Sequence, residues 1–129
     1  MHPQNPYRTP LDFIALAEAY PNLKPFLKKG STGVVINFQD EAAQRCLTKA
    51  LLLCDFGLSL DLPPDRLCPP VPNRLNYILW IQDIMGACAR REPTHGVVRC
   101  VDIGTGASAI YPLLGCKSDP SWIFWVHRD

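Results

Sequence analysis

The chain has 129 residues, of which 47% are hydrophobic and 19% charged, so a disordered chain is excluded and one globular domain with a modest core is expected. The net charge of +1 at pH 7 excludes a general electrostatic attraction to nucleic acid or to a membrane surface, so any RNA contact has to come from local patches. No apolar run approaches the roughly 20 residues that span a membrane, and no membrane partner is expected.

The first part of the chain predicts an arm, a short helix and a basic turn. Residues 1–10 contain three prolines and predict an extended, mobile arm. Residues 11–20 carry apolar side chains at helical spacing and predict a short amphipathic helix that stops near Pro21. A basic turn with two glycines follows, formed by Lys24, Lys28 and Lys29. This turn is either solvated or in contact with phosphate, and residues 34–38 after it predict a short strand.

The clearest amphipathic pattern predicts a helix that Asp40 caps and that ends before Gly57. Its apolar stripe comprises Ala43, Cys46, Leu47, Ala50, Leu51 and Cys54. We expect this helix to form core and to carry no chemistry. Residues 58–72 contain five prolines and predict a connector without helix or strand.

A second long helix is predicted from an N-cap at Asn73 to about Cys88. Its inward-facing side chains are expected to be Leu75, Ile78, Leu79 and Met85. Arg74 stands near the start of this helix. It is either a surface arginine or a clamp for an anion, because the guanidinium fork suits a carboxylate.

A glycine-rich stretch after residue 96 organises the rest of the chain. Residues 97–103 predict a β-strand, residues 107–114 a helix and residues 122–126 a second strand. Strand, helix and strand within about thirty residues make a βαβ unit, whose two strands are parallel neighbours. Because two parallel strands alone do not make a viable sheet, the pattern predicts the start of an α/β domain that is truncated here.

The turn between strand and helix predicts a ligand site. Gly104 and Gly106, followed by Ala109, satisfy the dinucleotide fingerprint G-x-G-x-x-G/A. Asp102, two positions before the first glycine, gives a D-x-G-x-G pattern that resembles the first motif of the Rossmann-like methyltransferases, and this resemblance implies a site for S-adenosylmethionine instead. A tight structural turn without a ligand remains the third interpretation.

The cysteines and histidines predict no metal site. The six cysteines form no CxxC pair and follow no secretory signal, so we expect reduced thiols in an intracellular protein, nuclear or cytoplasmic. Several of these cysteines lie in apolar runs, as buried thiols do. His2, His95 and His127 have no ligand-like partners nearby in the sequence.

Three segments stand out in combination, residues 74–80 (RLNYILW), 102–108 (DIGTGAS) and 110–115 (IYPLLG). Together with residues 55–58 (DFGL) and 70–72 (PVP), they resemble the methyltransferase-like protein 16 family, which includes the bacterial ribosomal RNA adenine N6-methyltransferase F. The resemblance implies methyl transfer from S-adenosylmethionine to the exocyclic amine of adenosine in structured RNA, of small nuclear or ribosomal type. It implies an α/β fold in which residues 1–93 form a helical RNA-binding module and residues 94–129 begin a Rossmann-like methyltransferase domain.

Individual positions carry over from the family by resemblance. Arg74 is similar to the arginine that meets the cofactor, and Asp102 is similar to the acid of the first methyltransferase motif. The cofactor pocket is then lined by Gly104, Thr105, Gly106 and Ser108. RNA contacts are expected from Arg8, Lys24, Lys28 and Lys29.

The chain departs from the family in two places, and no catalytic residue is predicted. The asparagine-proline-proline-aromatic motif that holds the target amine is missing, and the segments beginning at Asn5 and at Asp119 do not replace it. Arg128 stands where the family has an acid for the ribose, and a cation cannot accept those hydrogen bonds. We therefore expect no turnover from these 129 residues alone. The alternatives are a non-catalytic RNA-binding or competing role and a dinucleotide-binding fragment.

Overall fold

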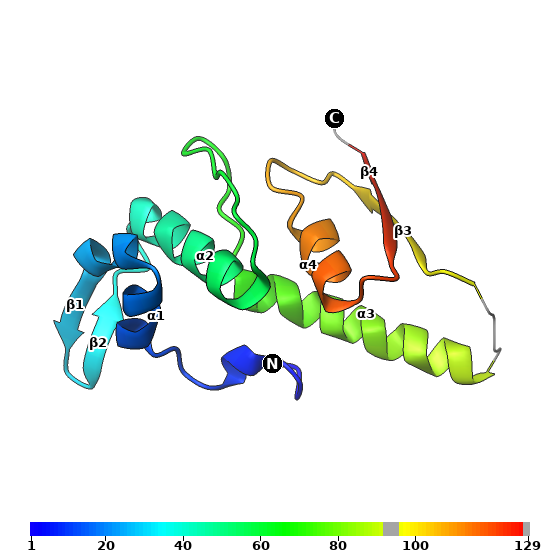
Figure 1. The fold of residues 1–129 in the computed structure, drawn as a ribbon, viewed down its shortest axis with the longest axis horizontal. Coiled ribbons are helices and arrows are strands. Elements are labelled where there is room, and N and C mark those ends of the chain that lie inside the picture. Colours follow the sequence, from blue (N-terminus) through cyan, green and yellow to red (C-terminus); the bar gives the residue numbers. More distant parts are fainter. Residues whose placement is uncertain (92–95, 128–129) are drawn as a thin grey trace. The chain divides into compact units, whose positions relative to one another are not determined.

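The computed structural model describes residues 1–91 and 96–127, which form a mixed α/β fold as predicted (Figure 1). The chain divides into two compact units. The helix–hairpin unit is Thr9–Val71, and the βαβ unit joins Met1–Arg8 to Pro72–Asp129. This division rests on compactness and says nothing about which residues bind RNA, so the functional boundary at residue 93 stays a prediction.

The helix–hairpin unit begins with a short helix and a β-hairpin. Helix α1 (Phe13–Ala19) is capped by the side chain of Asp12, which accepts hydrogen bonds from two backbone N–H groups of the first turn. A 3₁₀ segment, η2 (Pro21–Phe26), leads into strands β1 (Leu27–Gly30) and β2 (Gly33–Ile36), which pair antiparallel. The predicted helix and strand are confirmed. The predicted basic turn is wrong, because Lys28 and Lys29 lie within β1 and Lys24 lies in η2.

Helix α2 (Glu41–Phe56) confirms the clearest sequence pattern. The Asp40 carboxylate caps its first turn, and Gly57 ends it with a left-handed backbone of φ 63°, which glycine adopts without a Cβ clash. The predicted burial of Cys54 is wrong, because this side chain is exposed while Thr48 and Leu52 are buried. The buried side of α2 is shifted because the connector packs there, with Thr48 Oγ1 donating to the Pro69 carbonyl at 3.1 Å.

The connector after α2 contains neither helix nor strand, as its prolines predict. It is held to α2 by the Thr48 hydrogen bond and by an ion pair of 3.5 Å between Lys49 and Asp61. Asp61 is almost fully exposed, so this ion pair contributes little to stability. The connector therefore depends mainly on Leu62 and on Pro69, both of which are buried.

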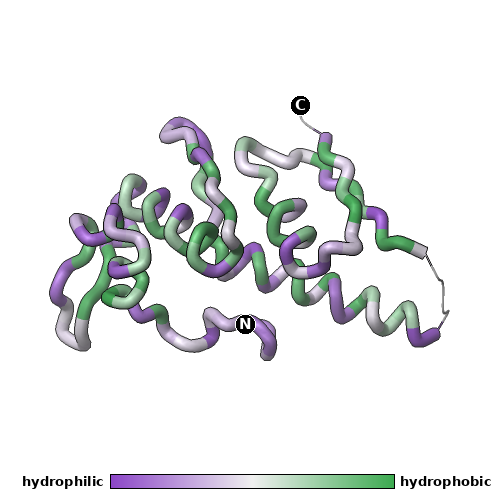
Figure 2. The backbone as a smooth tube through the Cα atoms, viewed as in Figure 1, coloured by the Kyte–Doolittle hydropathy of each residue, from purple (hydrophilic) through white to green (hydrophobic). Residues whose placement is uncertain are grey.

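Helix α3 (Val71–Arg91) begins the folded core of the βαβ unit. The N-cap prediction at Asn73 is wrong, because the helix starts two residues earlier. Pro72 fits its first turn, where a missing backbone N–H costs no helical hydrogen bond. Leu75 and Ile78 are buried as predicted. Hydrophobic and hydrophilic residues alternate along α3, as expected for a helix with one packed side (Figure 2).

Strands β3 (Arg99–Ile103) and β4 (Ile123–His127) pair parallel, with helix α4 (Ile110–Ser118) between them in sequence (Figure 1). This confirms the predicted βαβ unit. The predicted helix start at residue 107 is wrong by three residues. Gly106 and Ala109 adopt positive φ values of 71° and 49°, which a right-handed helix cannot contain, so the turn extends to residue 109.

The two faces of this sheet differ sharply in burial. Side chains alternate along a strand, so that Cys100 and Phe124 point to one face, where they line the same pocket and are half-buried. The opposite face exposes Val101, Ile103, Ile123 and Trp125, with exposed fractions of 66%, 79%, 46% and 51%. The first face is thus partly packed, with Val126 exposed near its end, and the other is an open apolar surface.

The N-terminal residues are ordered, so the prediction of a mobile arm is wrong. Asn5 is 2% exposed, and its Nδ2 donates to the Pro72 carbonyl at 3.0 Å while its Oδ1 accepts from the Tyr7 N–H at 2.9 Å. His2 adds a contact of 2.7 Å between Nε2 and the Asp83 carboxylate on α3. A short 3₁₀ turn, η1 (Pro6–Arg8), follows Asn5. The arm is ordered because Asn5 and His2 form hydrogen bonds with residues of α3, which composition alone does not predict.

We expect Asn5→Ala to lower the free energy of unfolding of the βαβ unit by about 1–2 kcal/mol, because two part-buried hydrogen bonds are lost. Urea unfolding followed by tryptophan fluorescence measures this, since Trp80, Trp122 and Trp125 all lie in this unit. Gln4→Ala is the matched control, because Gln4 is exposed and its hydrogen bond to His2 Nδ1 uses only its backbone N–H. Equal stability of the two variants would show that the arm does not support α3.

Candidate functional site

The turn that follows β3 is held by hydrogen bonds of Thr105, and its two glycines face open space. Gly104 and Gly106 have positive φ values of 74° and 71°, and a Cβ added at either would meet nothing within 4 Å. Thr105 between them is 9% exposed, its Oγ1 donates to the Asp102 carbonyl at 3.0 Å, and its N–H donates to the His127 carbonyl at 3.3 Å. The turn therefore presents bare backbone to open space, where a ligand can approach closely. Thr105 fixes the shape of the turn rather than facing that space.

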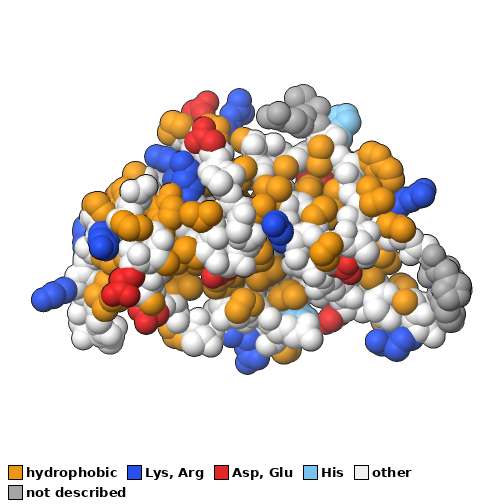
Figure 3. Space-filling view, in the orientation of Figure 1, with side chains coloured by type: hydrophobic (Ala, Val, Ile, Leu, Met, Phe, Trp, Pro, Cys, Tyr) orange, Lys and Arg blue, Asp and Glu red, His pale blue; other side chains and the backbone are white. Residues whose placement is uncertain are grey.

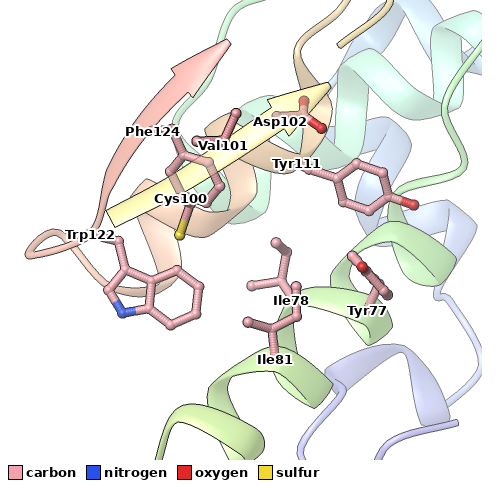
Figure 4. A pocket seen from close by; sticks show the side chains of 9 residues that line it. All are labelled: Tyr77, Ile78, Ile81, Cys100, Val101, Asp102, Tyr111, Trp122 and Phe124. Carbon is pink, nitrogen blue, oxygen red and sulfur yellow. The ribbon is translucent and has the colours of Figure 1, made fainter. Parts of the chain in front are cut away.

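One oxygen of the Asp102 carboxylate lacks a hydrogen-bond partner among the described residues. Its Oδ2 is buried and has no hydrogen-bond partner, and it is the sole side-chain oxygen or nitrogen in that condition among residues 1–91 and 96–127. A buried polar atom without a partner costs free energy, so native proteins rarely keep one without a reason. The side chain borders a pocket (Figure 4). Within residues 1–91 and 96–127, no hydrogen-bond donor meets this oxygen.

The pocket has a volume of about 290 Å³ and lies within the βαβ unit (Figure 4). It is lined by Tyr77, Ile78, Ile81, Cys100, Val101, Asp102, Tyr111, Trp122 and Phe124. Most of the lining is apolar or aromatic, and the carboxylate of Asp102 lies on the same side as the rings of Tyr77 and Tyr111. These two rings meet edge to face with centroids 5.1 Å apart. A small molecule with a flat apolar part and a few polar groups suits such a pocket.

Arg74, on α3, contacts Tyr111, which lies on the same side of the pocket as Asp102. Its Nη1 donates to the Tyr111 hydroxyl at 3.0 Å, and its guanidinium carbon lies 5.4 Å from the centroid of the same ring. Within the described residues no carboxylate pairs with Arg74, so its other N–H donors remain for an anion. Asp102 and Tyr111 both line the pocket, whereas Arg74 is not among the lining residues and contacts the pocket wall through Tyr111. The two interpretations of Arg74, a surface arginine and an anion clamp, both stay predictions.

The start of α4 adds unsatisfied donors beside the turn. Ala109 occupies the N-cap position with φ 49°, and no side chain caps the helix. Ser108 is half-buried in the turn just before it. The first backbone N–H groups of a helix have no intrahelical partner, and in α4 these are the N–H groups of Ile110 and Tyr111, because Pro112 has none and Leu113 donates to the Ala109 carbonyl.

The basic residues predicted to contact RNA are divided between the two units. Arg8 belongs to the βαβ unit, where its Nη1 donates to the Pro3 carbonyl at 3.4 Å. Lys24, Lys28 and Lys29 are exposed in the helix–hairpin unit. Consecutive residues of a strand point to opposite faces, so Lys28 and Lys29 diverge. Lysine and arginine side chains are dispersed among uncharged ones on the face seen in Figure 3.

The cysteines are all free thiols, and the prediction that several are buried is wrong. Three are half-buried and three, Cys54, Cys88 and Cys116, are exposed. Burial raises the pKa of the Cys100 thiol above its ordinary value, and the nearby Cys116 raises it further, so Cys100 stays protonated at neutral pH. Cys100 is therefore a poor nucleophile in the pocket.

The part of the chain that the structure describes contains neither a metal-binding cluster nor a membrane-spanning helix. Outside the gap at residues 92–95 and the last two residues, no three His, Cys, Asp or Glu side chains gather to hold a metal ion. Over the same residues, no helix has the length and apolar character to cross a bilayer. His95 and the expected ribose position, Arg128, lie outside the described residues.

Sequence reasoning gave no site role to Trp122 or Phe124, and it also missed the two tyrosines of the pocket, Tyr77 and Tyr111. Both stand in the segments that carry the family resemblance, but neither was assigned a role. One signal was present, since Tyr77 follows Arg74 by three residues and shares its helix face. Tyr111 gave no such signal, because its contact with Arg74 spans 37 positions of the chain.

Comparison with known proteins gives the site its context. Residues 1–128 match the RNA methyltransferase family. The zebrafish (Danio rerio) RNA N(6)-adenosine-methyltransferase mettl16 is 47% identical over 126 residues, which is 96% of this chain and 25% of the relative. The N-terminal domain of human METTL16 in complex with SAH superposes with a TM-score of 0.87 at 45% identity, over 99% of this chain and 49% of that one.

A second structure of the human protein carries RNA. The catalytic domain of hMettl16 in complex with MAT2A 3′UTR hairpin 6 superposes with a TM-score of 0.86 at 46% identity, over 99% of this chain and 44% of that one. The chain spans about a quarter of the zebrafish relative and about half of each solved domain. The likeness covers both units and includes the glycine turn. With its βαβ unit, its glycine turn and a match over nearly its whole length, this chain belongs to the RNA methyltransferase family.

Proposed function

We propose that this chain provides the S-adenosylmethionine-binding part of an RNA adenosine N6-methyltransferase. The observation that carries the proposal is the buried, unpartnered Asp102 Oδ2 beside the open glycine turn. A ligand that donates a hydrogen bond and brings an apolar body satisfies both the carboxylate and the pocket. S-adenosylmethionine has an ammonium group, a carboxylate and a flat adenine, and bound it would supply the methyl group. The solved relative with SAH supports this choice of ligand.

In this proposal each residue of the site has a role that follows from its chemistry. Asp102 accepts hydrogen bonds from donors on the ligand, and Arg74 holds a carboxylate with its free N–H groups. Gly104 and Gly106 leave room for the ligand to approach the backbone closely, and Ser108 lies two residues before the start of α4. Thr105 keeps the turn in shape from behind.

Binding by calorimetry or thermal shift tests the cofactor. We expect S-adenosylmethionine and S-adenosylhomocysteine to bind and to raise the unfolding temperature of the βαβ unit. NADH should give no shift, because Asp102 precedes the glycines where a dinucleotide site carries an apolar residue. Stabilisation by NADH alone would overturn the proposal in favour of a dinucleotide site.

We further propose structured RNA as the partner, with contacts from Arg8, Lys24, Lys28 and Lys29. The solved relative with an RNA hairpin and the exposed lysines of β1 support it. A gel shift with an RNA hairpin should show binding that weakens with salt and on Lys28→Glu. Binding that Lys28→Glu leaves intact would contradict a role of this strand.

The 129 residues taken alone should bind the cofactor without transferring its methyl group. No asparagine-proline-proline-aromatic motif is present to hold and orient a target amine. Methyl transfer from labelled S-adenosylmethionine to a hairpin measures this directly, and methylated product would refute it. The free thiols agree with an intracellular, nuclear or cytoplasmic site of action, which cell fractionation can test.

A further inference from the structure

The Arg74 side chain can bind a carboxylate in a fixed geometry only if other residues restrict its conformation. An arginine side chain has several rotatable bonds, and fixing them on ligand binding costs conformational entropy. In this structure one of its N–H groups already donates to the Tyr111 hydroxyl at 3.0 Å. The guanidinium is therefore oriented before any ligand arrives.

Tyr111 is itself held on two sides. Its ring meets the Tyr77 ring edge to face, with centroids 5.1 Å apart. Its backbone lies in the first turn of α4, whose Gly115 packs directly against the Phe124 ring of β4. The position of the Tyr111 hydroxyl is thus restricted, and Arg74 on α3 donates a hydrogen bond to it.

We propose that Tyr111 is a positioning residue, which orients the Arg74 guanidinium to receive the carboxylate at the amino-acid end of the ligand. The proposal rests on the S-adenosylmethionine site proposed above. Because the Tyr111 hydroxyl accepts one Arg74 hydrogen, the remaining donors of the guanidinium fork face a defined direction. Tyr111 acts through Arg74 and does not take part in the chemistry of methyl transfer.

A pair of ligands that differ at one end tests this role. S-adenosylhomocysteine carries the amino-acid end, whereas 5′-methylthioadenosine keeps the adenosine and the sulfur but lacks the carboxylate. We expect Tyr111→Phe to weaken binding of S-adenosylhomocysteine about five- to tenfold, as the loss of one hydrogen bond to a charged group does. Binding of 5′-methylthioadenosine should stay the same, because the phenylalanine ring preserves the pocket wall.

A double-mutant cycle shows whether Tyr111 acts through Arg74. Arg74→Lys keeps the charge but removes the fork, and it should weaken S-adenosylhomocysteine binding at least as much as Tyr111→Phe. Adding Tyr111→Phe to Arg74→Lys should then cost little more, because the group being oriented is already gone. Tyr20→Phe, in the helix–hairpin unit, is the control for loss of a tyrosine hydroxyl and should leave both affinities unchanged.

The outcomes separate this inference from the proposed function. If wild-type protein binds S-adenosylhomocysteine but Tyr111→Phe weakens both ligands equally or neither, the positioning role is overturned and the cofactor site stands. Fully additive losses in the cycle overturn it too, since they show that Tyr111 contacts the ligand independently of Arg74. If the wild type binds neither ligand, the proposed function fails and this inference fails with it. Arg74→Lys gives a second reading should Tyr111→Phe lower stability, which tryptophan fluorescence reports.

Discussion

Gly115→Ala should lower the free energy of unfolding of the βαβ unit by about 1–3 kcal/mol, because an added Cβ has no room. A Cβ built at this position lies 2.5 Å from Cζ and 2.6 Å from Cε2 of the Phe124 ring. The ring can relieve the overlap only by moving away from α4. Since Phe124 lines the pocket, that movement also reduces the space for the ligand.

Tryptophan fluorescence during urea unfolding measures this loss, because Trp122 lies 6.2 Å from the Phe124 ring between centroids. Gly86→Ala is the matched control on α3, where an added Cβ meets only the end of Arg90 at 3.9 Å. That variant should gain about 0.5–1 kcal/mol from the better helix propensity of alanine. In a Gly115→Ala, Phe124→Leu double variant the loss should be smaller than the sum of the single losses, because the overlapping ring atoms are removed. Wild-type stability of Gly115→Ala would show that α4 does not pack as closely as described.

Asp102→Asn should weaken S-adenosylhomocysteine binding about tenfold or more while leaving the ligand-free protein as stable as before or more stable. The opposite signs have one cause. Oδ2 is buried without a partner, so in the ligand-free protein the carboxylate gains nothing from its burial. With ligand bound, a charge-assisted hydrogen bond to that oxygen contributes to affinity, and the asparagine amide removes it.

Calorimetry gives the affinity, and the unfolding midpoint without ligand gives the stability. Asp119→Asn is the control within the same unit, because Asp119 Oδ1 is fully partnered by the N–H and the hydroxyl of Ser121. It should lose a little stability and no affinity. A less stable Asp102→Asn with unchanged affinity would mean that Asp102 holds the turn and does not contact a ligand. The sign of the stability change thus separates a binding residue from a structural one.

Local signals in the sequence predicted most of the elements of the fold. Asp40 and Gly57 mark the ends of α2 through interactions with their own neighbours, so both could be identified before any tertiary contact was known. The alternation of β-branched residues before Asp102 predicted β3, and the glycines after it predicted the turn. Element boundaries failed where a single residue overrode the pattern, as Ala109 with its positive φ delays the start of α4.

Other features depend on residues that are far apart in sequence. The arm was expected to be mobile because its composition is poor in core residues, yet Asn5 is buried through a carbonyl 67 positions away. The exposure of Cys54 follows from the connector covering a different side of α2. Neither contact leaves a trace in local periodicity.

The sequence by itself determined the family of this protein, the βαβ unit and the acid and glycines of its site, because turn chemistry and strand patterning act over a few residues. The tertiary structure alone decided that Arg74 donates to Tyr111 at the wall of the pocket of Asp102, and that Asp102 Oδ2 lacks a partner among the described residues. These depend on how α3, α4 and β3 pack. Hydrogen bonds and voids between such elements arise only when the whole core has formed.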